Sequence, residues 1–163
     1  MVFVPTAVTP DPPPAHAPEP PKLFRDSSDL DGIYVWLGPE GAANWIDSQW
    51  DMTFGVDASL VRVREHESMA AIGGSLGAAK WTSRGGGRVW AEALLGTSLA
   101  GHVVGLSAGP LLELSDFEHP HIGGSVGIWG FIGVTPYARV GRVDSLGNFA
   151  EIGVHIALPA FRR

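Results

Sequence analysis

The sequence predicts an all-β protein, an antiparallel up-and-down β-barrel of about eight strands behind a proline-rich N-terminal leader. Three observations support this prediction: segments of roughly ten residues at regular spacing, turn-forming residues between them, and alternation of apolar with small or polar residues inside them. Successive side chains of a strand point to opposite faces of the sheet, so this alternation is typical of strands with two unlike faces.

The composition of the chain changes sharply near residue 30. Eight of the 13 prolines fall within residues 1–22, whereas all 22 glycines lie at or after Gly32. Proline fixes its φ angle and lacks an amide proton, so a segment rich in proline favours an extended chain over a helix or a sheet. We therefore expect a disordered leader over residues 1–30 and one barrel domain over residues 31–163.

Eight segments of the barrel domain are predicted to be strands. They cover residues 32–38, 50–64, 69–80, 88–97, 101–114, 121–131, 136–143 and 149–158. The stretches between them, such as 83–87 and 144–148, are rich in Gly, Ser, Asp and Asn, which form tight turns at low steric cost. No segment combines a sustained helical periodicity with capping residues, although residues 89–99 are rich in Ala and Leu.

Each predicted strand has one apolar face and one face of small or polar residues. In residues 50–64, for example, Met52, Phe54 and Val56 share one face, and Asp57 and Ser59 share the other. In residues 73–79 and 123–127 the second face consists of Gly, Ser and Ala, which suit a narrow barrel interior. A strand surface that meets water is typically rich in Lys, Glu, Thr and Arg. We therefore expect the apolar face to point outward and the polar face to line the lumen.

The charged residues of the predicted strands follow the small or polar face. Buried charges need partners, so we expect acidic and basic side chains to pair inside the barrel. The predicted lumen cluster contains Asp57, Glu92, Glu113, Arg139, Glu151 and His155. Four basic residues share the parity of the apolar face, but all lie near strand ends, where long side chains can reach an interface: Arg62, Arg64, Lys80 and Arg142.

In strand number, strand length and alternation, residues 31–161 resemble the small eight-stranded outer-membrane barrels of the OmpA and OmpX type. The resemblance implies a bacterial outer-membrane or cell-envelope location, a lipid bilayer as partner, and a non-enzymatic structural or surface role. In that family the last strand carries an aromatic residue near the C-terminus, and Phe161 looks similar although it is not terminal. Aromatic residues near strand ends would form interface belts in such a barrel, and the candidates are Trp45, Trp50, Trp81, Phe131 and Phe161.

The sequence departs from that family in three respects. Residues 1–9 are apolar but short and follow no basic residue, so they do not form a secretory signal. Every predicted loop is short, whereas one rim of the family's barrels normally carries long loops. Pro110 falls inside a predicted strand, and we expect it to interrupt that strand. Either the signal lies outside this chain, or the protein is not exported by the usual route, and a cytoplasmic location is the alternative for the second case.

Composition and motifs argue against several other functions. The net charge of −6 and the lack of a basic run argue against binding of nucleic acid. The chain has no cysteine for thiolate chemistry, and the pair His119 and His121 flanks a proline with no third ligand nearby, so we predict no metal and no cofactor. Residues 105–109 match the GxSxG pattern, but Ser107 lies within a strand instead of a strand–turn–helix elbow.

The leading hypothesis is therefore a non-enzymatic outer-membrane or envelope barrel. A soluble barrel that binds a small hydrophobic ligand is the first alternative, and it requires Met52, Phe54, Val56 and Ile152 to point inward. A barrel-embedded hydrolase, in which His155 activates a serine, is the second. Self-association through the apolar face is a further alternative.

Overall fold

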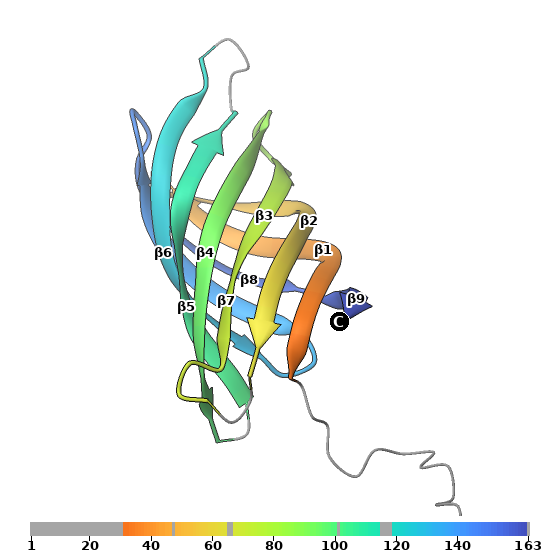
Figure 1. The fold of residues 1–163 in the computed structure, drawn as a ribbon. Helices are drawn as coiled ribbons and strands as arrows, with labels where there is room; N and C mark the ends of the chain where they lie inside the picture. Colours follow the sequence, from red (N-terminus) through yellow and green to blue (C-terminus); the bar gives the residue numbers. More distant parts are fainter. Residues whose placement is uncertain (1–30, 47, 65–66, 101, 115–118, 163) are drawn as a thin grey trace, which may run out of the picture.

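The strands of this protein close into a barrel. The computed structural model describes residues 31–46, 48–64, 67–100, 102–114 and 119–162, so the predicted leader lies outside the described residues. The strands are β1 (Gly32–Ile46), β2 (Gln49–Val63), β3 (Ala71–Trp81), β4 (Gly87–Leu99), β5 (His102–Glu113), β6 (His121–Phe131), β7 (Thr135–Val143), β8 (Gly147–His155) and β9 (Leu158–Arg162). From β1 to β8 each strand pairs antiparallel with the next, and β8 pairs with β1 (Figure 1). The predicted all-β, eight-stranded antiparallel barrel is confirmed.

The first strand is twice as long as predicted. β1 pairs with β2 along its whole length, from Gly32 opposite Val63 to Ile46 opposite Gln49. The prediction ended this strand at residue 38 because the following Pro, Gly and Asn residues are typical of turns. In the structure, Pro39 lies where the second neighbour of β1 changes from β9 to β8, so its missing N–H falls at a break in that pairing.

Gly38, which precedes Pro39, lies in close contact with the chain just after β8. The Ile156 amide donates a hydrogen bond of 3.0 Å to the Pro39 carbonyl. A Cβ atom added to Gly38 would lie 1.7 Å from the Ile156 carbonyl oxygen, so only glycine permits this approach.

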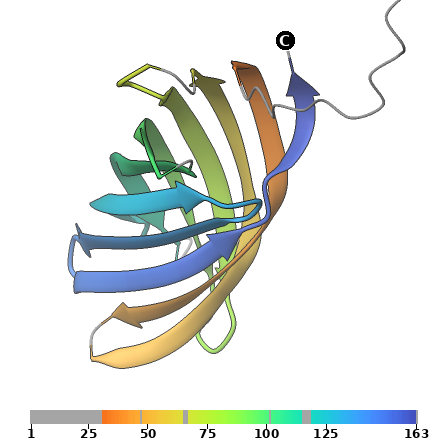
Figure 2. The same ribbon diagram turned by 90° about the horizontal axis from the view of Figure 1, so that it is seen from below.

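The predicted last strand, residues 149–158, ends earlier in the structure, and a short further strand follows it. β8 ends at His155, and β9 begins at Leu158 after a short break. β8 pairs with β7 and with the second half of β1, whereas β9 pairs only with the first half of β1. Figure 2 shows β9 continuing beside the start of β1 and away from the β6–β7 hairpin. Among the described residues, one edge of β9 therefore has no neighbouring strand.

Pro110 does not interrupt its strand, contrary to the prediction. β5 runs continuously from His102 to Glu113, and Pro110 pairs with Gly124 of β6. On its other side the ladder with β4 skips the two positions between the pair Trp90–Leu111 and the pair Ala93–Ala108. The missing amide proton thus costs ladder bonds to one neighbour only, and the bonds to β6 keep the strand extended.

The apolar face of the strands points away from the barrel. Val56, Leu76 and Ile152, for example, are 56, 60 and 63% exposed. The exposed apolar side chains of the strands form a surface that we call the apolar belt: Met52, Phe54, Val56, Leu60, Ile72, Leu76, Leu95, Leu106, Ile122, Val126, Ile128, Val140, Ile152 and Val154. The alternate residues face the lumen and are largely buried.

Two buried apolar clusters fill the ends of the lumen. At the end where β1 begins, which we call the proximal end, Tyr34, Trp36 and Trp129 are the large members of the first cluster. At the opposite, distal end, Trp81, Trp90 and Phe149 are the large members of the second. Trp81 is therefore inside the barrel and not in an outward aromatic belt as predicted. Phe131 likewise packs against the proximal cluster.

The other three predicted belt aromatics do lie on the outer surface. Trp45, Trp50 and Phe161 are exposed near strand ends. Among the described residues, no helix is long and apolar enough to cross a membrane.

Candidate functional site

Buried charged side chains occupy the lumen between the two apolar clusters. All six residues of the predicted lumen cluster point inward: Asp57, Glu92, Glu113, Arg139, Glu151 and His155. The structure divides them into an ion-pair network, which contains Glu92, Glu113, Arg139 and Glu151, and a separate Asp57–His155 pair. Glu151 and His155, four residues apart on β8, thus have different partners.

Glu151 bridges the two buried arginines of the network. Its Oε2 accepts a hydrogen bond of 2.7 Å from Nη1 of Arg88, and its Oε1 accepts one of 2.7 Å from Nε of Arg139. Arg88 comes from β4, Arg139 from β7 and Glu151 from β8, so the network joins opposite parts of the barrel wall. Charge-assisted bonds of this kind restrict the geometry of the lumen as well as neutralising its charges.

Arg139 collects two further carboxylates. Its guanidinium lies 3.3 Å from Glu92 and 3.4 Å from Glu40. The Tyr137 hydroxyl lies 2.6 Å from Oε1 of Glu40, and the guanidinium of Arg139 lies over the rings of Tyr137 and Trp90. Every face of this cation therefore meets a carboxylate or an aromatic ring.

Arg88 has an equally enclosed position nearer the distal end. It is 1% exposed, and its Nε donates a hydrogen bond of 2.9 Å to Glu113, which also accepts one from Nε1 of Trp81. Nη2 of Arg88 has no hydrogen-bond partner among the described residues, but its guanidinium lies over the rings of Trp81 and Phe149. Cation–π attraction with both rings stabilises the buried charge.

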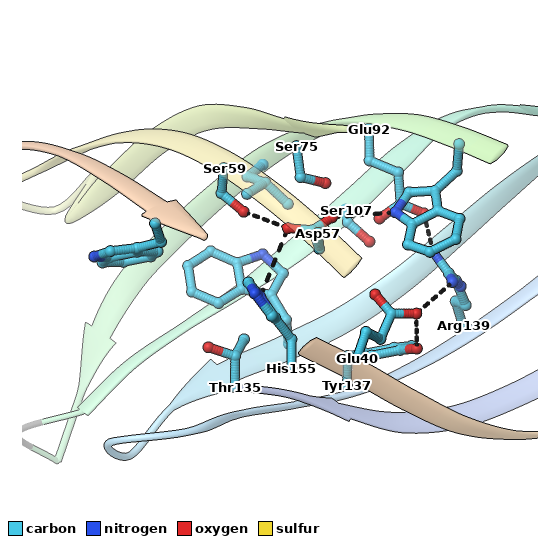
Figure 3. Close-up of a pocket in the computed structure, with 14 residues that line it drawn as sticks. Glu40, Asp57, Ser59, Ser75, Glu92, Ser107, Thr135, Tyr137, Arg139 and His155 are labelled. Atoms are coloured by element: carbon cyan, nitrogen blue, oxygen red, sulfur yellow. Dashed lines mark hydrogen bonds and ion pairs between the residues drawn. The ribbon is translucent and has the colours of Figure 1, made fainter. Parts of the chain in front are cut away.

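The Asp57–His155 pair lies toward the proximal end. Asp57 accepts hydrogen bonds from Ser59 Oγ at 2.6 Å and from Trp90 Nε1 at 3.3 Å. Nδ1 of His155 lies 3.6 Å from Asp57 Oδ1, a contact that is an ion pair only when the imidazole is protonated and that is too long for a hydrogen bond. Figure 3 shows the imidazole between Asp57 and Thr135.

A small cavity of about 50 Å³ separates the pair from the Arg139 part of the network. It has room for a few water molecules, and Glu40, Asp57, Arg139 and His155 line it (Figure 3). Two of its buried polar atoms, Nε2 of His155 and Oγ1 of Thr135, have no hydrogen-bond partner among the described residues. The two residues are directly opposite each other on β8 and β7. The cavity thus presents one imidazole nitrogen and one hydroxyl to whatever fills it.

Acidic groups outnumber basic ones in this lumen. The described interior contains five carboxylates, Glu40, Asp57, Glu92, Glu113 and Glu151, and only two guanidinium groups. No group of three or more His, Cys, Asp or Glu side chains among the described residues is arranged to hold a metal ion. The two arginines pair with four of the five carboxylates: Glu40, Glu92, Glu113 and Glu151.

The sequence prediction missed Glu40 and Asn44 as members of the network. Both were missed because the first strand was expected to end before them. Alternation beyond residue 38 would have placed Glu40 and Asn44 on the same face as Tyr34 and Trp36.

A separate polar contact holds the distal rim, outside the apolar belt. Asp51 accepts hydrogen bonds from Thr82 Oγ1 at 2.9 Å, from the Met52 amide at 2.8 Å and from the Arg84 amide at 3.2 Å. Desolvation of the carboxyl group opposes its ionisation, but these hydrogen bonds outweigh that cost and hold the pKa of Asp51 well below its usual range. The carboxylate therefore fastens the β3–β4 connection to β2.

The fold and the lumen together define the class: a closed antiparallel β-barrel, apolar outside, with a packed and charged interior. Comparisons with protein-family models, curated proteins and solved structures find no match to this chain.

Proposed function

We propose that the protein is a membrane-spanning β-barrel of a bacterial outer membrane or cell envelope, with a non-enzymatic structural or surface role. The apolar belt is the observation that supports it, because contiguous exposed apolar surface of this extent is rare on soluble monomers. The strands β1 to β8 contain 9 to 15 residues, and a tilted strand crosses a bilayer with about 9–11.

The distribution of charge also supports a lipid-facing outer surface. Among the described strand residues, the outward-pointing lysine and arginine side chains are Arg62, Lys80 and Arg142, and each is the penultimate residue of its strand. At that position a long side chain can reach the interface of a bilayer. The carboxylates and the other strand arginines that are described point inward.

The soluble carrier requires the reverse orientation of the strands. Met52, Phe54, Val56 and Ile152 would have to line the lumen, and all four are exposed on the outside. The lumen is instead filled by ion pairs and by the two apolar clusters. The orientation therefore favours the membrane barrel over the carrier.

Arginine substitutions at two depths test the membrane proposal. Leu76 lies in the middle of β3 and Leu99 ends β4, and both side chains are about equally exposed. In a bilayer, Leu76→Arg should cost about 2–4 kcal/mol of folding free energy and the control Leu99→Arg only about 0–1 kcal/mol. Urea unfolding in lipid vesicles measures both. Equal costs at the two positions would contradict a lipid-facing belt.

The solubility of the purified chain gives an independent test of the membrane proposal, and it also tests the alternative of self-association. The membrane proposal expects the purified chain to need detergent or vesicles to fold and to be monomeric in micelles. A folded, detergent-free oligomer in light scattering would overturn the proposal and assign the apolar belt to contacts between copies.

A barrel-embedded hydrolase is a second candidate, and the unpartnered Nε2 of His155 beside the Thr135 hydroxyl favours it. An Asp–His–hydroxyl arrangement can activate the hydroxyl as a nucleophile. The test is hydrolysis of p-nitrophenyl butyrate by the refolded chain, with His155→Gln and Thr135→Val as variants and the exposed His102→Gln as control. Loss of activity in the first two variants alone would support this candidate, and an inactive wild type would exclude it for this ester.

A further inference from the structure

The described residues leave a gap in the barrel wall at the proximal end. The β7–β8 ladder ends with the pair Thr135 and His155, and beyond it β9 follows β1 with no described strand on its other side. Phe131, at the end of β6, lies across this gap, because it lines the same cavity as Ala157 and Pro159. In the part of the chain that the structure describes, β9 and β6 are therefore not paired with each other.

An apolar cavity of about 160 Å³ lies behind the gap. Its walls are side chains of β1, β2, β5, β6 and β9 and of the β8–β9 break, including Tyr34, Trp36, Val103, Phe131 and Ala157. None of the residues that line it is charged. A dry cavity of about 150 Å³ with an apolar lining can hold a ligand the size of benzene.

The stacked rings of Trp36 and Phe131 separate this cavity from the charged lumen. Their centroids are 5.2 Å apart and their planes nearly parallel. Trp36 also lines the polar cavity that contains His155, so it forms the wall between the two cavities. A guest of the apolar cavity therefore meets hydrocarbon and aromatic surface and not the buried ion pairs.

We infer that this cavity binds the end of an acyl chain from a bilayer lipid, which enters sideways through the gap between β9 and β6. The inference rests on the proposed membrane location, since only then does the gap open to lipid. The side chains at the mouth of the gap favour an acyl chain, because exposed apolar residues flank it on both sides. Ile132 follows β6, and Leu158 and Phe161 belong to β9. The cavity is too small for a folded segment of a protein partner but fits the end of one chain.

A lipid that carries a photoreactive diazirine at the end of one acyl chain tests the inference. The full chain is reconstituted into phosphatidylcholine vesicles that contain this lipid, irradiated, and mapped by peptide mass spectrometry. We expect label on outward residues of the apolar belt, such as Leu76, and also on the inward-facing Val103 and Tyr34, which lipid outside an unbroken wall cannot reach.

Neighbouring residues at the β8–β9 break supply a matched pair of variants. Ala157 is buried and lines the cavity, whereas Ile156 points outward. Ala157→Trp should fill the cavity and abolish the inward label, and Ile156→Trp should leave that label unchanged. Val103→Phe, which narrows the cavity from β5, should reduce the label if Ala157→Trp does not fold.

The outcomes separate this inference from the proposed function. Belt label without inward label would overturn the acyl-chain site and leave the membrane barrel standing. Absence of both labels would overturn both proposals. Inward label that persists in folded Ala157→Trp would show that the label does not come from this cavity, and would also overturn the inference.

Discussion

Arg139 is the residue on which most of the buried charges depend. Its guanidinium contacts three carboxylates, Glu40, Glu92 and Glu151. Each of these carboxylates also has another polar neighbour. Because acids already outnumber guanidinium groups in the lumen, removing a cation leaves more uncompensated charge than removing an acid does.

We therefore predict that Arg139→Met destabilises the barrel more than Glu151→Gln. Breaking a buried ion pair costs about 3–5 kcal/mol, and Arg139→Met should fall in this range. The exposed pair Arg64–Glu67 supplies the control, since Arg64→Gln should change stability by about 1 kcal/mol or less. Urea unfolding in detergent micelles ranks the variants. A larger loss of stability for Glu151→Gln than for Arg139→Met would contradict the argument from the excess of acids.

Asp51 should make stability depend on pH. Its pKa is lowered in the folded state, so its contribution is present above the unfolded pKa, near 3.9, and is lost as the pH falls toward the folded value. Asp51→Asn cannot ionise and should lose less stability than the wild type between about pH 5 and pH 2. Parallel unfolding curves of the two proteins over this interval would contradict the prediction.

At the scale of single strands, β3 shows how small residues admit large neighbours into the lumen. A Cβ added to Gly77 would lie 2.1 Å from the ring of Trp90, which comes from the adjacent strand β4. Trp90 in turn donates a hydrogen bond to Asp57. The Gly and Ser face of β3 therefore leaves the space in which the ring of Trp90 packs.

Gly77→Ala should accordingly displace Trp90 and cost about 1–3 kcal/mol of stability. Gly124→Ala is the matched control, because its Cβ would lie an ordinary 3.6 Å from the Gly109 carbonyl oxygen and the residue faces outward. Thermal or urea unfolding together with tryptophan fluorescence compares them. Equal stability of the two variants would show that Trp90 moves aside without loss.

The predictable parts of the strands were those whose alternation is uninterrupted. β6 was predicted with its observed bounds, His121–Phe131. β1 and the β8–β9 region were mispredicted because their irregular features depend on each other. Gly38, Pro39 and the break after His155 are explained by the contact between Pro39 and Ile156, which lie 117 residues apart in the chain.

For the molecule as a whole, the packed lumen predicts a barrel that does not conduct ions. Aromatic clusters fill both ends and ion pairs fill the middle. Planar-bilayer recordings of the reconstituted chain should show no steady channel conductance. Stable single-channel steps in the wild type would contradict this prediction, and chains denatured by heating before reconstitution are the control for leaks.

Two-residue alternation is a local property of an extended chain, and it was enough to predict the fold class and the position of most strands. Which charges meet followed from the folded barrel. Folding brought Glu40, Arg88 and Arg139 to one network, placed Trp81 and Phe131 inside the barrel, and left one edge of β9 without a strand neighbour among the described residues. These features depend on register between strands and on closure of the barrel, which join residues far apart in the chain.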